Sequence, residues 1–433
     1  MRVANTAPPA GRTVNRVTLA GTLGMYLEFY DYAIYGFLAG NIATVFFPGH
    51  DATAALLATY SVFALTFIFR PLGGLVLGSL ADRIGRRTVL VLSLTLMTVS
   101  VAVIGVLPGY ASIGVTATVL LIAMRLLQGF SAGGEVGAAI TFVAEYSPSG
   151  QRALRIAWVQ MGSFSALLTG TLLAWGLSGA LGEPAMDSWG WRIPFLVAVP
   201  LGVIGYLIRA RLDETPVYRE LKQTERVASS PVKETLLSGP GLKNLSRALL
   251  IPLLNSSGYY VLFVYMPTYL KTSLHFSTGK ALALTAAGLI VLIACMPFAA
   301  ALSDRIGRRP VLLSSAVAMA VLAWPAYRLI SLGNLAAALA GVVLLAVAFS
   351  GHTGVVHAAL IELFPTRVRN TGYSMGYNIN TAVFGGGGPL LMTYLIAHTG
   401  DTGFPAYYAI ITAVGTGIAV LLTHETGRKE LVA

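Results

Sequence analysis

Two short segments of this sequence each occur twice. SLADRIGRRTVLVLS, at residues 79–93, returns as ALSDRIGRRPVLLSS at residues 301–315. Farther along each half, AEYSPSGQR at residues 144–152 is echoed by IELFPTRVR at residues 361–369. The two offsets, 222 and 217 residues, agree to within a few residues. Two echoes in the same order indicate that the chain has two halves of the same plan, related as parallel repeats.

Composition places both halves in a membrane. Apolar residues make up 55% of the chain and charged residues only 11%, whereas a soluble domain carries about 25% charged residues. The charges are also bunched, and a membrane-spanning helix needs about 20 mostly apolar residues. We therefore expect an all-α polytopic membrane protein with twelve transmembrane helices in two six-helix bundles. The expected spans are 17–47, 54–80, 88–107, 112–145, 153–180, 192–211, 246–272, 279–302, 310–330, 335–363, 370–397 and 404–424.

Polar stretches divide the chain into five parts. The only long polar stretch in its interior lies between the sixth and seventh runs, which predicts a linker between two bundles. The expected parts are an N-terminal tail (1–16), a first bundle (17–211), a linker (212–245), a second bundle (246–424) and a C-terminal tail (425–433).

The distribution of basic residues predicts the orientation. If both tails lie on one side, 23 of the 29 Lys and Arg residues fall on that side, and Arg70 and Arg125 fall within spans. The opposite side receives only Arg192, Lys271, Lys280 and Arg328. The basic side should be cytoplasmic, so we expect a multi-pass protein of the cell (inner) membrane with both termini in the cytoplasm. The net charge of +11 then reflects topology and does not indicate a nucleic-acid partner.

Several motifs resemble a known transporter family. DRIGRR, present in both halves, resembles the signature of the major facilitator superfamily. FGGGGPLL at 384–391 and PAYY at 405–408 resemble the proline/betaine branch of its metabolite:proton symporter family. Further motifs that resemble this family are LEFYDYAIYGF (27–37), FRPLGG (69–74), RLLQGFSAGGEVGAA (125–139), WGWRIPF (189–195), RARLDETPVY (209–218) and FPTRVRNTGYSMGYNI (364–379).

This resemblance implies a secondary transporter that works by alternating access. We expect proton-coupled uptake of a small carboxylate-bearing metabolite, with a proline- or betaine-like zwitterion as first choice. A di- or tricarboxylate, or another organic acid such as α-ketoglutarate, citrate or shikimate, is the alternative substrate. A proton-antiport exporter of a drug or metabolite is the alternative function, although the expected fifth span lacks the Gly-Pro motif of many such exporters.

No enzyme chemistry is indicated by the residues. The sequence shows no nucleophile–base pair and no cluster of metal ligands, so we expect no catalytic residues, no metal and no cofactor. The proton gradient is the expected energy source. The expected partners are a small-molecule substrate, protons and the lipid bilayer, with no nucleic acid, and the protein is expected to be a monomer.

Two acids stand inside the first apolar run, GMYLEFYDYAIYGF at residues 24–37. A charge at the bilayer centre costs roughly 2.5–3.5 kcal/mol on insertion scales. Glu28 and Asp31 are three residues apart and share a helical face, and two neighbouring carboxylates away from water cannot easily both ionise. We therefore assign proton coupling to Glu28, Asp31 and, in the expected fourth span, Glu135. The alternative is an ion pair with Arg70 or Arg125 that only locks helices together, and the two roles can coexist.

The expected substrate site combines arginines, amides and aromatic rings. Arg125 is the first choice, because a guanidinium fork matches a carboxylate, whereas Arg70 beside Pro71 is either a second ligand or structural. The helix at 255–270 is interrupted by Gly and Pro, which points to a binding site, and its aromatic rings can hold a quaternary ammonium or simply pack. The other expected ligands are Tyr35, Gln128, Asn255, Tyr259, Tyr377 and Asn378.

The repeated loops predict a pair of gates. In each half, an Asp at a helix–loop–helix corner precedes arginines that can pair with an acid at a neighbouring helix end. One exposed ion pair contributes only ~0–1 kcal/mol, so several pairs must act together; simple anchoring by positive charge is the alternative. The expected gate residues are Asp82, Arg86, Arg87, Glu145, Asp304, Arg308, Arg309 and Glu362.

Overall fold

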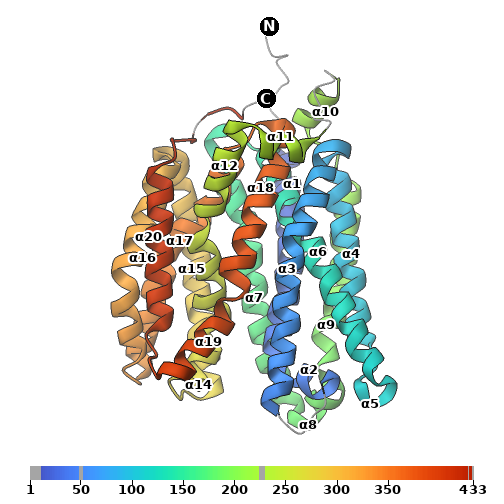
Figure 1. The fold of residues 1–433 in the computed structure, drawn as a ribbon, viewed down its shortest axis with the longest axis vertical. Helices are drawn as coiled ribbons and strands as arrows, with labels where there is room; N and C mark the ends of the chain where they lie inside the picture. The colour runs from blue at the N-terminus through green and yellow to red at the C-terminus, as the bar shows by residue number, and fades with distance from the viewer. Residues whose placement is uncertain (1–10, 48–51, 224–229, 428, 432–433) are drawn as a thin grey trace.

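The computed structural model describes residues 11–47, 52–223, 230–427 and 429–431. These residues form an elongated bundle of long helices that run roughly along its vertical axis in Figure 1. They contain no β-strand. Both marked ends of the chain lie at the top of the bundle.

Among the described residues, eleven helical segments are long and apolar enough to cross a membrane. The N-terminal helix α1 (Gly11–Phe37) is a further span and brings the total to twelve. Its 27 residues are about 40 Å long, although Glu28 and Asp31 reduce its apolar character. The described residues therefore contain the twelve spans that the sequence predicts. The other spans of the first half are α3 (Ala52–Ile84), α4 (Arg86–Val106), α6 (Val115–Tyr146), α7 (Arg152–Leu181) and α9 (Arg192–Ala210). The uninterrupted spans of the second half are α15 (Thr278–Ile306), α16 (Arg308–Ile330), α17 (Leu335–Ile361) and α20 (Phe404–Leu421).

Two spans of the second half are broken. Each contains a π-helical segment. Such segments are rare in proteins, and those that occur often lie at functional sites. A proline follows each segment within a few residues. One span consists of α12 (Gly239–Leu250), α13 (Leu253–Ser257), η3 (Gly258–Val264) and α14 (Met266–Thr272). The other consists of α18 (Arg369–Asn380), η5 (Thr381–Gly386) and α19 (Gly388–Thr399).

Short helices occupy the ends of the bundle and the connection between the halves. At the ends lie α2 (Ala39–Phe46), α5 (Tyr110–Ile113), α8 (Glu183–Ala185), η1 (Ser149–Gln151), η2 (Met186–Gly190) and η4 (Thr366–Val368). In the expected linker, α10 (Pro216–Gln223) and α11 (Pro231–Leu237) both begin at a proline, which is favoured in the first turn of a helix. The helices α1 and α12 begin inside segments expected to be tail and linker. Residues 1–10, 224–229, 428 and 432–433 of the expected tails and linker lie outside the described residues.

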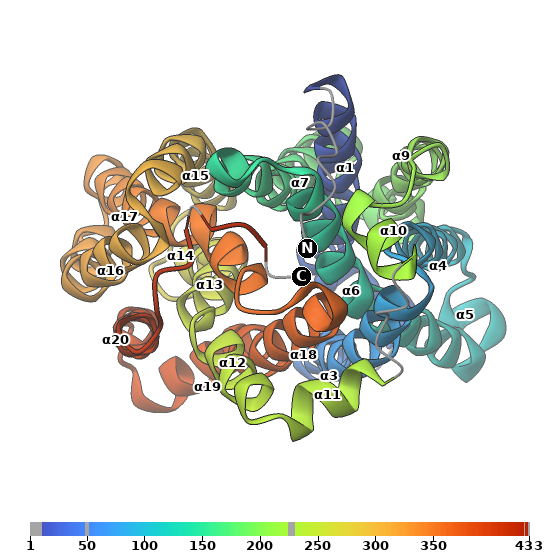
Figure 2. The same ribbon diagram turned by 90° about the horizontal axis from the view of Figure 1, so that it is seen from above.

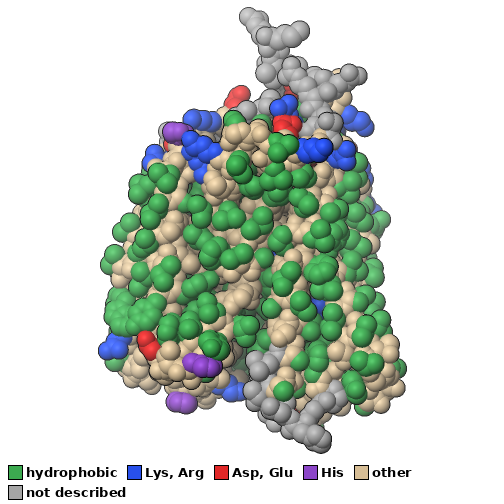
Figure 3. All heavy atoms as spheres, in the orientation of Figure 1, with side chains coloured by type: hydrophobic (Ala, Val, Ile, Leu, Met, Phe, Trp, Pro, Cys, Tyr) green, Lys and Arg blue, Asp and Glu red, His purple; other side chains and the backbone are tan. Residues whose placement is uncertain are grey.

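The two halves meet mainly where α3 and α7 of the first half pack against helices of the second half. Seen from above, the first half lies mainly on the right and the second half on the left (Figure 2). At the boundary α7 packs against α15 and α17, and α3 packs against α18. Apolar side chains cover the visible face of the bundle, whereas Lys and Arg gather at the top, near both ends of the chain (Figure 3). We call this top the basic end.

Glycines bring α3 and α6 into backbone contact. A Cβ at Gly133 would collide with the backbone of Arg70 and Gly74, and one at Gly73 would collide with the backbone of Phe130. Small residues allow such close approach in membrane helices. The crossing fixes the distance between the helices that carry Arg70 and Arg125.

Gly133→Ala should therefore destabilise the protein. Backbone atoms cannot rotate away from the added methyl group, so we expect a loss of about 1–3 kcal/mol, measured as a lower thermal unfolding temperature of the purified protein in detergent. Gly176→Ala in α7 is the matched control, because nothing lies within 4 Å of its added Cβ. Equal unfolding temperatures for the two variants would contradict the close crossing.

Candidate functional site

Each acid of α1 has its own arginine. Glu28 Oε1 lies 2.9 Å from Arg70 Nη2 on α3, and Asp31 Oδ2 lies 2.6 Å from Arg125 Nη1 on α6. Gln128 donates to Asp31 Oδ1 at 3.1 Å and accepts from Arg125 at 2.7 Å. All five side chains are buried. Both ion pairs that the sequence analysis offered as helix locks are thus present, and the roles of the acids in proton coupling remain predictions.

Part of the Arg125 guanidinium forms no hydrogen bond with the described residues. Within the described part of the chain its Nε and Nη2 atoms have no hydrogen-bond acceptor, although both are buried. The ring of Tyr35 lies 4.0 Å from its guanidinium carbon, close enough for a cation–π contact, and the Tyr35 hydroxyl donates to the Thr59 carbonyl at 3.2 Å. The guanidinium is therefore held in place by Asp31 and Tyr35 while part of its fork is available to another acceptor.

Arg70 connects the two halves. Its Nη1 donates to the Tyr32 hydroxyl at 3.4 Å, and its Nε donates to Asn378 Oδ1 on α18 at 3.4 Å. Asn378 in turn donates to the Gly133 carbonyl on α6 at 2.7 Å. Arg70 thus contacts an acid of α1 and an amide of the second half at the same time.

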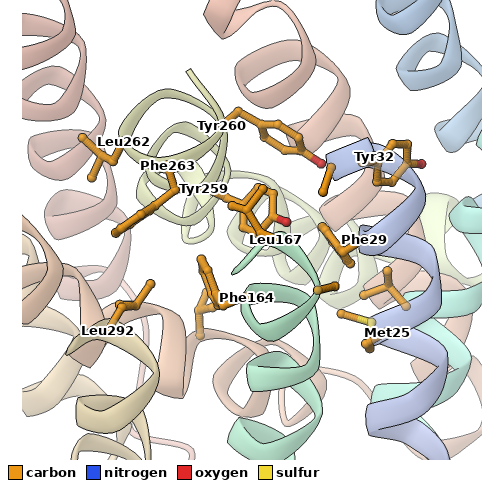
Figure 4. Close-up of a cluster of buried hydrophobic side chains, with 14 of the residues drawn as sticks. Met25, Phe29, Tyr32, Phe164, Leu167, Tyr259, Tyr260, Leu262, Phe263 and Leu292 are labelled. Carbon is orange, nitrogen blue, oxygen red and sulfur yellow. The ribbon is translucent and has the colours of Figure 1, made fainter. Parts of the chain in front are cut away.

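Aromatic rings fill the boundary between the halves (Figure 4), and Tyr32 among them lies 5.5 Å from the Arg70 guanidinium carbon. Phe29 of α1 and Phe164 of α7 each lie 5.0 Å from Tyr259 of η3, centroid to centroid. Tyr260 lies 5.1 Å from Phe67 of α3, and its buried hydroxyl has no hydrogen-bond partner among the described residues. The broken helix thus presents two tyrosines to the first half.

The remaining expected ligands lie on the second half. Tyr377 is buried and stacks on Tyr373 with centroids 5.6 Å apart. The Asn255 side chain, on the broken helix, is within hydrogen-bonding range of Tyr377. Asn255 and Tyr377 are thus both buried in the second half, on the two broken spans.

Glu135 lies in a different environment from the other two acids. It pairs with Arg209 of α9 at 2.5 Å and accepts a short hydrogen bond from Ser93 of α4. Arg209 also donates to the carbonyls of Ala20 at 3.2 Å and Leu90 at 3.0 Å. Sequence reasoning missed Arg209, because an arginine at the end of a span is typical of simple anchoring. This cluster ties four helices of the first half together.

At the basic end, the acids and arginines of the first gate form a chain of contacts. Arg86 Nη2 lies 3.2 Å from Asp82 and 3.4 Å from Glu145, and Glu145 lies 3.0 Å from Arg369 of the second half. Asp82 also accepts hydrogen bonds from the backbone N–H and hydroxyl of Thr371, at 2.8 and 2.7 Å. The first half is therefore bonded directly to α18.

The second gate repeats this plan. Arg308 lies 2.7 Å from Asp304 and 2.9 Å from Glu362, and Glu362 lies 2.7 Å from Arg152 of the first half. Asp304 accepts hydrogen bonds from the backbone of Ala153 and Leu154. Each half thus supplies an arginine to the glutamate of the other half. Both arginines, Arg152 and Arg369, end the second sequence echo, but they were not among the expected gate residues.

A Glu-Thr pair follows the last helix of each half and supports the gate. Glu214 accepts from the backbone N–H of Arg87 at 3.1 Å, and Glu425 accepts from that of Arg308 at 2.8 Å. The adjacent threonines donate to the gate glutamates, Thr215 to Glu145 at 2.6 Å and Thr426 to Glu362 at 2.8 Å. Partial burial raises the pKa of Glu425, but hydrogen bonds from three backbone N–H groups outweigh it, so the pKa lies below its usual value. The repeated Glu-Thr pair was a sequence signal that reasoning missed.

The side chains of two expected gate residues, Arg87 and Arg309, contact the ends of neighbouring helices. Arg87 donates to the Ala210 carbonyl at 2.5 Å, and Arg309 donates to the Leu421 carbonyl at 3.0 Å. These are the last carbonyls of α9 and α20, which a cation stabilises. No contact of either side chain with a gate acid is recorded in the described chain. The reason is helical geometry, since the next residue points about 100° around the helix from Arg86 or Arg308.

No group of three or more His, Cys, Asp and Glu side chains that could hold a metal ion occurs in the part of the chain that the structure describes.

Comparisons with known proteins agree with this geometry. The family described as Major Facilitator Superfamily matches residues 23–375 and 281–431. A proline/betaine transporter of Salmonella typhimurium is 35% identical over 96% of this chain and 85% of its own length. A citrate-proton symporter of Klebsiella pneumoniae is 33% identical over 100% of this chain and 97% of its own length. The solved structure of the proton:xylose symporter XylE bound to 6-bromo-6-deoxy-D-glucose shares the fold, with a TM-score of 0.81 and 19% identity over 97% of this chain and 98% of that one.

Neutralising Glu135 should destabilise the first half. Glu135→Gln leaves Arg209 buried without its acid, which costs roughly 3–5 kcal/mol, and Glu135→Gln/Arg209→Met should recover most of that loss because no charge is then stranded. Asp213→Asn is the matched control, since its pair with Arg219 is exposed. Thermal unfolding in detergent measures all three variants. A double variant no more stable than Glu135→Gln would show that the pair is not the cause.

Proposed function

This chain belongs to the Major Facilitator Superfamily, and we propose that it takes up a small zwitterion of the proline or betaine kind together with protons. A proline/betaine transporter is 35% identical to this chain and a citrate-proton symporter 33%. A di- or tricarboxylate is therefore the second candidate substrate. The protein is a transporter in a membrane. We place it in the cytoplasmic membrane with both termini inside, acting as a monomer without a cofactor.

One observation carries the choice of a zwitterion: two nitrogens of the buried Arg125 guanidinium have no acceptor among the described residues, while Asp31 and the Tyr35 ring hold the group in place. Its Nε and Nη2 lack acceptors among the described residues and can form a two-point contact with one carboxylate. Tyr259 and Tyr260, with Phe29 and Phe67 opposite them, offer ring faces to a quaternary or secondary ammonium. A citrate-like substrate would need a second cation with free donors. All three nitrogens of the Arg70 guanidinium are already engaged, by Asn378, Tyr32 and Glu28.

Charge balance supports coupling at Asp31. Arg125 is paired with Asp31 at 2.6 Å, and a buried charge without a partner costs several kcal/mol. When a substrate carboxylate takes Arg125, the displaced Asp31 carboxylate is left in the same buried place unless it binds a proton. One substrate carboxylate and one proton therefore leave the charge around Arg125 unchanged. The ammonium of a zwitterion adds one positive charge, which the aromatic rings can hold. Glu28, held by Arg70, is the second candidate for the same exchange.

Formation and release of the gate contacts let the protein alternate between states that are closed and open at the basic end. Among the described residues, two arginine–glutamate pairs and three hydrogen bonds from backbone N–H groups to Asp82 and Asp304 cross between the halves at the basic end. Their formation favours a state closed on that side, and their release favours the state open to the cytoplasm. The centre and the gate share α18, which carries Arg369 and Thr371 at one end and Asn378 farther along.

Transport assays test the proposal directly. Purified protein in proteoliposomes should accumulate labelled proline or glycine betaine under an inward proton gradient, more strongly when the outside is acidic. A protonophore should abolish accumulation. Labelled citrate and labelled α-ketoglutarate are tested in the same way. Accumulation of citrate but neither zwitterion would favour the second candidate, and export driven by proton entry would overturn symport.

Asp31→Asn should separate exchange from accumulation. The amide cannot release a proton, so we expect counterflow of substrate to persist while accumulation under the proton gradient falls to background. Glu28→Gln is tested in parallel, and Glu220→Gln, on the exposed face of α10, is the control. Wild-type accumulation in both buried-acid variants would rule out an essential role for either acid.

Asp304→Asn should slow alternation and spare binding. The change weakens the contacts of Asp304 with Arg308 and with the backbone of Ala153 and Leu154, and these lie at the end of the bundle. We expect the uptake rate to fall roughly tenfold, about 1.4 kcal/mol, with substrate affinity nearly unchanged. Glu234→Gln, which loses a half-exposed pair with Arg367, is the control. Lost affinity with an intact exchange rate would contradict the gate.

A further inference from the structure

A groove opens on the outer side of the first half, at the basic end. It has a volume of about 260 Å³ and is lined by Arg16, Leu19, Ile204, Leu207, Ile208 and Arg211. These residues come from the first turns of α1 and from the last turns of α9 and the residue after it. The two helices pack against each other, and both lie at the rim of the bundle when it is viewed from above (Figure 2).

The apolar walls of the groove face the surroundings of the bundle. Leu19 is 52% exposed, Ile204 50% and Leu207 48%. At this place in a membrane protein such side chains meet lipid tails rather than protein. The groove is thus open toward the bilayer and continues the apolar surface of α1 and α9.

The head of the groove is cationic. Arg16 and Arg211 are both exposed, and none of the described residues that line the groove is acidic. Arg209, two residues before Arg211, has the opposite arrangement: it is buried and paired with Glu135. The end of α9 therefore uses one arginine to hold the bundle together and directs another toward the groove.

We propose that this groove binds one anionic phospholipid of the leaflet at the basic end. The headgroup phosphate lies between Arg16 and Arg211, and an acyl chain lies along Leu19, Ile204 and Leu207. Basic pockets between membrane helices select anionic headgroups, and arginine stems extend along apolar surface to reach the interface. A zwitterionic phospholipid offers the same phosphate, but its ammonium group is repelled by two arginines that have no acid beside them in the groove.

The bound lipid would bridge two helices that matter for transport. α1 carries Glu28 and Asp31, and the Arg209 guanidinium of α9 already donates to the Ala20 carbonyl of α1 at 3.2 Å, one turn along α1 from Arg16. A phosphate between Arg16 and Arg211 adds a second connection between the same helices at the membrane surface. The site lies outside the substrate path and does not depend on which metabolite is carried.

Native mass spectrometry of the purified full chain tests the site. Phosphatidylglycerol or phosphatidylcholine is added to delipidated protein, and the bound lipids are counted as a function of lipid concentration. The test variant is Arg16→Gln/Arg211→Gln, and Arg16→Lys/Arg211→Lys keeps both charges. Lys222→Gln/Lys243→Gln is the matched control, since it removes two exposed charges away from the groove.

We expect wild type, the lysine variant and the control to retain one phosphatidylglycerol in preference to phosphatidylcholine. The glutamine variant should bind it roughly 30-fold more weakly, since each basic residue contributes about fivefold at an anionic surface. Unfolding temperatures in detergent confirm that the variants are folded. Equal retention of phosphatidylglycerol by the glutamine variant and the control would overturn the proposal, as would equal retention of the two lipids by wild type.

Discussion

A charge buried in a bilayer needs a partner, and the arrangement of this protein depends on how that requirement is met. Glu28 and Asp31 are matched by Arg70 and Arg125 at the centre, and Glu135 is matched by Arg209 within the first half. Removing one member of such a pair strands the other at a cost of several kcal/mol. The same cost makes the central pairs suitable for coupling, because a substrate carboxylate can replace an acid only if that acid is neutralised.

At the basic end, the partners are exchanged between the halves. Arg152 of the first half forms an ion pair with Glu362 of the second, and Arg369 of the second half forms one with Glu145 of the first. Because each glutamate also contacts an arginine of its own half, separating the halves disturbs both networks at once. The two arginines occupy the same position in the sequence repeat, so the exchanged pairing follows from placing two similar bundles face to face. Duplication of one half would create both pairs together.

The sequence predicts the membrane fold because twenty-residue apolar runs and a repeated loop are local patterns. It also predicts that Asp82 and Glu145 share one network and Asp304 and Glu362 another, since their register is the same in both halves. The sequence could not show whether Glu28 and Asp31 form ion pairs with Arg70 and Arg125, because the position of an arginine on another helix depends on packing. Arg87 and Arg309 were misplaced for a similar reason: neighbouring residues on a helix face different ways, and only the structure shows which way a partner lies.

The central claim is that the exchanged pairs hold the basic end closed, and a distance measurement across that end tests it most directly. Spin labels are placed at Ile84→Cys and Ile306→Cys, equivalent exposed positions at the ends of α3 and α15, with Cys295→Ser to remove the natural thiol. In nanodiscs without substrate, double electron–electron resonance should give one short distance. Adding Glu145→Gln and Glu362→Gln should shift the population to a longer one. The same distance distribution with and without the two glutamates would contradict the account.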